Sequence, residues 1–329
     1  MPSSRPDAPR PPRAGGRAPA LLLAAVLAVA AACASSGPGA LPDGTGPASA
    51  PPVPGGPCPV DPVPVTVSVD QWRDLVQHLG GRCVSVTTVI AGSAADPHEY
   101  EPSPADVAAL GGARLVVVNG LGYDAWASAA VAARSPGPAL VTAAVAAGAR
   151  PGDNPHLWYS PEAVARTSEA VTDQLRALLP GAGSHLDERA AGWRQERAPI
   201  DTLVASIRGR HSGRTYAATE PVFDPMAAAA GLRDVTPPGY AAAAGNGSEP
   251  APGDLAAFRS ALRDHAVDVL VVNTQTEGAT AEQLRAAADA AGVPVVEVTE
   301  TVAPGQPSFV AWQTAQLEAL DRALGGSGR

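Results

Sequence analysis

The sequence predicts an α/β protein of two lobes, each with a parallel sheet flanked by helices. Three observations predict this class. Short β-branched runs alternate with segments of helical apolar spacing, which is typical of buried parallel sheets. The apolar content of 45% is that of a packed protein. The 272 residues from 58 to 329 exceed what one core usually organises, so they are expected to form two lobes.

The first segment, residues 1–32, is expected to be a signal peptide. Four arginines precede the apolar run Ala18–Ala32, which has the length and flanks of a secretory signal. Ala30–Ala32 resemble a bacterial lipobox, in which the following residue, Cys33, is lipidated and becomes the mature N-terminus. Ordinary signal-peptide cleavage beside an incidental cysteine is the alternative. Segment 33–57 is rich in Pro, Gly, Ser and Ala after its cysteine and is expected to be a flexible tether.

The body of the chain alternates predicted strands and helices, and two Ser-Pro pairs mark helix starts, at Ser103 and Ser160. The predicted strands are Val65–Val69, Val84–Ile90, Leu115–Val118, Leu140–Thr142, Thr215–Thr219, Asp268–Val272 and Val293–Val298. The predicted helices include Gln71–Leu79, Asp106–Leu110, Glu162–Leu179 and Leu255–Ala266.

One long segment, 184–210, combines spaced apolar side chains with many charges. It predicts a single long helix that joins an N-terminal lobe, 58–183, to a C-terminal lobe, 211–329. Cys58 and Cys83 each stand just before a predicted strand, and those strands are expected to be neighbours about 4.8 Å apart. We therefore expect a disulfide between them, which an extracytoplasmic setting permits.

The charge balance excludes several classes of function. The formal net charge is −9, and removal of residues 1–32, with four Arg and one Asp, changes it to −12. Such an acidic chain lacks the basic face that nucleic acid requires. Three cysteines are too few for a disulfide scaffold or a four-thiolate zinc site.

Four potential metal ligands follow predicted strands. His98 and His156 lie in loops beyond strands of the first lobe, and Glu220 and Glu300 follow strands of the second. Ligands of open α/β sheets bind at the carboxyl ends of the strands. Two imidazoles and two carboxylates suit Mn²⁺, Fe²⁺ or Zn²⁺. The sequence therefore predicts a metal site in a cleft between the lobes, and the other four histidines are expected to be surface residues.

The segments DPHEYEPSP and NPHLWYSP, which contain His98 and His156, resemble the histidine motifs of metal-specific solute-binding proteins of ABC importers. That cluster includes zinc- and manganese-binding lipoproteins. The resemblance extends to NGLGYDAW, EPVFDPMAAAAGL and VVNTQ, and it implies that His98, His156, Glu220 and Glu300 are the four ligands. Manganese-type members commonly have Asp at the fourth position, where this chain has Glu300.

The resemblance also implies a rigid linking helix, limited lobe movement, and a partner permease with a cytoplasmic ATPase. The expected protein is a monomeric, lipid-anchored receptor on the outer face of the cell membrane, not an enzyme. Two alternatives remain open: a metal-dependent hydrolase and an adhesive surface lipoprotein. The pattern G-x-G-x-x-A at Gly120–Ala125 fits a dinucleotide fingerprint, but no carboxylate follows at the required distance. These glycines are therefore expected to form a tight strand-to-helix turn.

Overall fold

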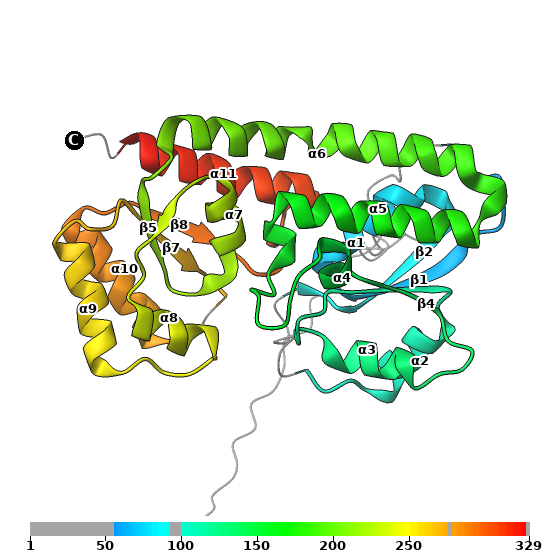
Figure 1. Ribbon diagram of the computed structural model, residues 1–329, viewed down its shortest axis with the longest axis horizontal. Coiled ribbons are helices and arrows are strands. Elements are labelled where there is room, and N and C mark those ends of the chain that lie inside the picture. Colours follow the sequence, from blue (N-terminus) through cyan, green and yellow to red (C-terminus); the bar gives the residue numbers. More distant parts are fainter. Residues whose placement is uncertain (1–55, 93–99, 276–277, 327–329) are drawn as a thin grey trace, which may run out of the picture. The chain divides into compact units, whose positions relative to one another are not determined.

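The computed structural model of the chain describes residues 56–92, 100–275 and 278–326 (Figure 1), which belong to one compact unit. The predicted signal peptide, Cys33, most of the tether and His98 lie outside these residues. Among the described residues we find no helix with the length and apolarity needed to cross a bilayer.

The first half of the described chain alternates strands and helices up to a long helix. Its strands are β1 (Val63–Val69), β2 (Val84–Ile90), β3 (Leu115–Val118) and β4 (Ala139–Thr142). Its helices are α1 (Arg73–Gly80), α2 (Pro104–Gly112), α3 (Ala125–Ala132), α4 (Ala143–Ala147) and α5 (Pro161–Leu178). The long helix α6 (Gly183–His211) follows.

The second half repeats this alternation. Its strands are β5 (Thr215–Ala218), β6 (Arg233–Asp234), β7 (Val269–Asn273) and β8 (Val295–Val298). Its helices are α7 (Asp224–Ala229), α8 (Pro238–Gly245), α9 (Pro252–Arg263), α10 (Ala279–Ala291) and α11 (Phe309–Gly326).

The eight strands form two parallel sheets with equivalent topology. The first has the order β2-β1-β3-β4 and the second β6-β5-β7-β8, so the strand that comes first in each half lies between the second and third. We call the parts built on these sheets the first and second lobes. The predicted fold class, two parallel sheets with flanking helices and one long helix, is confirmed.

Alternating side chains of the central strands enter different cores. Leu115 and Val117 of β3 face one core and Val116 faces another, as expected for a strand buried on both faces. In β7, Val269 and Leu270 divide in the same way. The core shared by the two sheets also contains residues of α5, α6 and α11, and Figure 1 shows α11 running beside α6.

Helix starts and turns follow the local sequence. Ser103 accepts a hydrogen bond from the backbone N–H of Asp106 in a capping box, and Ser160 accepts one from that of Ala163. Gly120 and Gly122 have φ values of +88° and +85°. A Cβ at Gly120 would also lie 2.8 Å from the Thr142 side chain, so this position requires glycine for conformation and space. The two glycines belong to a tight turn, as expected.

Candidate metal centre

His156 lies between α4 and the 3-10 turn η4 (Leu157–Tyr159), and its side chain is buried. Its Nδ1 is 2.7 Å from Asn154 Oδ1, while Asn154 Nδ2 donates to the carbonyl of Pro221 at 2.7 Å. Because a carbonyl only accepts, the amide nitrogen must face Pro221 and the amide oxygen must face the imidazole. The Nδ1–H of His156 therefore donates to Asn154, and Nε2 is the ring nitrogen that would ligate a cation.

Glu300 follows β8 and faces His156 from the second lobe. Its Oε1 lies 3.7 Å from His156 Nε2. Two ligands of a tetrahedral ion with metal–ligand distances near 2.1 Å are separated by about 3.4 Å. The two atoms are thus spaced almost as ligands of one four-coordinate ion.

The carboxylate of Glu300 also accepts a hydrogen bond of 2.7 Å from the hydroxyl of Tyr123. Burial, and then the negative charge of Glu300, raise the pKa of Tyr123 well above its usual value. Tyr123 therefore remains a neutral donor.

Glu220 stands at the start of the 3-10 turn η6 (Pro221–Phe223), two residues after the end of β5. Its Oε2 accepts a hydrogen bond of 2.6 Å from Asn273 Nδ2. The Oδ1 of Asn273 in turn accepts from the backbone N–H of Gln275, which fixes the amide orientation. Asn273, the last residue of β7, therefore holds the carboxylate of Glu220, which follows the neighbouring strand β5.

One cavity of about 340 Å³ brings together three of the four predicted ligands. His156, Glu220 and Glu300 line it, with Asn246 and Gly247 beyond α8. No group of three or more His, Cys, Asp or Glu side chains within ligating reach of one ion occurs among residues 56–92, 100–275 and 278–326. His98 lies outside these ranges, so the complete ligand set remains a prediction.

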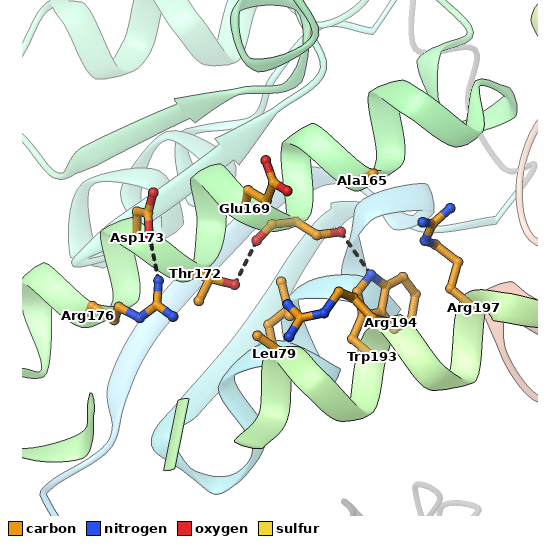
Figure 2. A pocket seen from close by; sticks show the side chains of 11 residues that line it. Leu79, Ala165, Glu169, Thr172, Asp173, Arg176, Trp193, Arg194 and Arg197 are labelled. Atoms are coloured by element: carbon orange, nitrogen blue, oxygen red, sulfur yellow. Dashed lines mark hydrogen bonds and ion pairs between the residues drawn. The ribbon is translucent and has the colours of Figure 1, made fainter. Parts of the chain in front are cut away.

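A second cavity of about 340 Å³ lies between α5 and α6, with Leu79 of α1 at its edge (Figure 2). Arg176, Arg194 and Arg197 line it, and Arg176 pairs with Asp173 at 2.7 Å. No histidine lines this cavity, and its three guanidinium groups outnumber its two carboxylates, Glu169 and Asp173, so its lining is positively charged. It is therefore not a candidate metal site.

Sequence reasoning missed the side chains that hold the candidate ligands. Asn154 is two residues from His156, but Tyr123 and Asn273 are 177 and 53 residues from the carboxylates that they contact. Asn273, in VVNTQ, directly follows the predicted strand Asp268–Val272, and that position is the signal which could have found it; Asn154 in GDNPH and Tyr123 in NGLGYDAW lie further from predicted strands and have no such signal. The expectation of a surface position is wrong for His78 and His211, because their side chains are only 10% and 11% exposed. The Nδ1 of His78 lies 2.9 Å from Glu196, and the Nε2 of His211 lies 3.2 Å from Asp321.

Residues 65–323 match the family described as zinc-uptake complex component A, periplasmic (ZnuA). The manganese-binding lipoprotein MntA of Halalkalibacterium halodurans is 26% identical over 145 residues, which are 43% of this chain and 48% of that protein. The high-affinity zinc uptake system protein ZnuA of Bacillus subtilis is 21% identical over 197 residues, 54% of this chain and 60% of that protein. The chain spans about half the length of the curated relatives it matches.

Among solved structures, the periplasmic zinc-binding protein TroA from Treponema pallidum has the same fold. It superposes with a TM-score of 0.68 at 19% sequence identity, over 80% of this chain and 99% of that chain. This similarity supports the two-lobed arrangement described above.

Proposed function

Because the chain belongs to the family of periplasmic zinc-uptake component A proteins, we propose that it captures a divalent transition metal and delivers it to an ABC importer. The cargo is Mn²⁺, Zn²⁺ or Fe²⁺, and the partner is a permease with its cytoplasmic ATPase. The family is extracytoplasmic and consists of transport components rather than enzymes. The observation that carries the proposal is the single cavity lined by His156, Glu220 and Glu300.

The proposed ligands are His98, His156, Glu220 and Glu300. Two neutral imidazoles and two carboxylates contribute a charge of −2, which balances a divalent cation. The Nδ1 of His156 faces Asn154, so Nε2 is the proposed ligating atom, and its 3.7 Å separation from Glu300 Oε1 supports shared coordination. As the ion enters, these groups replace its water ligands. Protons compete for the imidazoles, so metal affinity should fall at acid pH.

The proposed organisation places this site between two lobes, 58–183 and 211–329, joined by the helix over 184–210. Residues 1–32 act as a signal peptide, Cys33 carries the lipid, and the remainder of 33–57 is a tether. A short apolar signal followed by a Pro/Gly-rich stretch supports this arrangement. The protein then works as a monomer close to the membrane without entering it.

Metal titration of single variants tests the site. We expect His156→Ala to lower the affinity for Mn²⁺ and Zn²⁺ by more than about 100-fold. Loss of a residue that only supports a ligand lowers metal affinity by up to about 100-fold, so loss of a ligand itself should cost more. His265→Asn is the matched control, because His265 is exposed, has a φ of 53° that Asn tolerates, and does not line the cavity. Unchanged affinity in a His98→Ala/His156→Ala double variant would refute the proposal.

A further inference from the structure

Three hydrogen bonds from the first lobe end on two adjacent residues that follow β8. Gln71 Nε2 donates to the carbonyl of Glu300 at 3.1 Å, and the Tyr159 hydroxyl lies 2.7 Å from the carbonyl of Thr299. The third bond, from the Tyr123 hydroxyl to Glu300 Oε1, reaches the carboxylate itself. The first lobe therefore contacts both the backbone and the side chain of a proposed ligand that the second lobe contributes.

The direction of these bonds is determined by what each group can accept. The carbonyl of Glu300 only accepts, so the amide nitrogen of Gln71 must face it. The same nitrogen donates its second hydrogen to the Tyr123 hydroxyl oxygen at 3.2 Å. With that oxygen accepting from Gln71, the hydroxyl hydrogen of Tyr123 is directed to Glu300 Oε1. Gln71 and Tyr123 are 1% and 0% exposed, so water does not compete for these bonds.

We propose that Tyr123 is a positioning residue for metal capture, which holds the carboxylate of Glu300 towards His156 before the ion arrives. This inference rests on the proposed function. A carboxylate oxygen has two lone pairs, so Oε1 can accept from the phenol and still face a cation. A long glutamate side chain loses rotamer freedom when it binds an ion, and a donor that orders it beforehand reduces that cost.

The test is a Tyr123→Phe variant, which removes only the hydroxyl. We expect the affinity for Zn²⁺ and Mn²⁺ to fall by about 10- to 100-fold, as is typical when a group supporting a ligand is removed. The visible spectrum of the Co²⁺-loaded protein supplies a second readout, because its bands depend on the number and arrangement of the ligands. A loss of packing alone would not change these bands.

Tyr159→Phe is the matched control. It also removes a buried phenol hydroxyl that contacts the 299–300 segment, but this hydroxyl contacts the backbone carbonyl of Thr299 and the side chain of Gln316, not the carboxylate. We expect it to retain the wild-type Co²⁺ spectrum. Comparing Tyr123→Phe in the wild type and in Glu300→Ala then isolates the contact, and its effect on affinity should vanish when the carboxylate is absent.

The outcomes separate this inference from the proposed function. If the wild-type protein binds none of Zn²⁺, Mn²⁺ and Co²⁺, the proposed function and this inference both fail. If the wild type binds metal but Tyr123→Phe has the same affinity and spectrum, only the positioning role is refuted. The positioning role is also refuted if Tyr123→Phe lowers metal affinity by the same factor in the Glu300→Ala background as in the wild type.

Discussion

Neutral side chains, rather than charged ones, hold the described candidate ligands. Asn154 contacts His156, Asn273 contacts Glu220 and Tyr123 contacts Glu300. An arginine in any of these places would cancel part of the negative charge that attracts a divalent cation. Amide and phenol donors order the ligands while leaving that charge intact, so the arrangement suits cation capture better than anion binding.

His78 is a largely buried histidine remote from the candidate site. It packs on the ring of Trp193, and its Nδ1 lies 2.9 Å from Glu196. Burial, reinforced by the positive charge of Arg189, lowers the pKa of His78 to about 4. The nearby carboxylate of Glu196 favours the charged imidazole, but the effect of burial is larger, so His78 is neutral in the folded protein.

The neutral state of His78 predicts a pH-dependent stability. Between pH 6.5 and 4 the unfolded chain binds a proton at this residue that the folded protein does not, so stability is lost as the pH falls. The free energy of unfolding should decrease by at most about 3 kcal/mol over this window from this residue. Urea denaturation of His78→Gln at a series of pH values should give a flatter pH profile than the wild type. An equal slope in His78→Gln would contradict the prediction.

The candidate ligands could be predicted individually because each follows a β-branched run. His156, Glu220 and Glu300 needed only the rule that ligands gather at the carboxyl ends of parallel strands. Tyr123 could not be found in this way, because a phenol after a Gly-x-Gly turn is also an ordinary packing residue. Its contact with Glu300 depends on how the two lobes meet, which local patterns do not encode.

Among the strands, those with strong apolar patterns were predicted well and the weak one, β6, was missed, whereas several helices, α10 and α11 among them, were not named from the sequence. The predicted strands Val84–Ile90 and Leu115–Val118 match β2 and β3 residue for residue, and the predicted segment 184–210 differs from α6 by one residue at each end. β6 was not predicted, because it has two exposed residues, Arg233 and Asp234, at the edge of its sheet. Only its pairing with β5 makes it a strand.

The first two strands carry a covalent link at their start. Val63 of β1 pairs with Val84 of β2, and the Cys58–Cys83 disulfide precedes this pair with a Cα–Cα distance of 5.0 Å. The bond closes a loop of 25 residues that contains β1 and α1. Such a crosslink restricts the unfolded chain, so it should stabilise the first lobe.

Replacing both cysteines by alanine should therefore lower the free energy of unfolding by about 3 kcal/mol. Chemical denaturation with and without reductant measures this loss. Reductant should shift the wild-type curve towards that of the Cys58→Ala/Cys83→Ala variant and leave the variant unchanged. Alkylation of both thiols in the native wild-type protein without reductant would show that the bond does not form.

At the scale of the whole molecule, the lobes share a core rather than meeting only at a polar cleft. Val65 of β1 and Val271 of β7 belong to one cluster of buried side chains, which also contains Trp193 of α6 and Leu317 of α11. At the start of α11, the backbone N–H of Phe309 donates to Asp74 of α1 at 2.7 Å. Relative movement of the lobes would disturb this apolar packing, so only small movements are expected on metal binding.

The shared core leads to a prediction about unfolding. Because neither sheet keeps its full apolar cover without α6 and α11, the described part of the chain should unfold in one cooperative transition, with equal calorimetric and van't Hoff enthalpies. Phe258→Ala, which removes a ring from the core beneath α9, should lower the free energy of unfolding by about 3 to 5 kcal/mol. Calorimetry should show the whole transition moving to lower temperature. If the lobes were independent, the variant would instead split the transition and leave the first-lobe part at its original temperature.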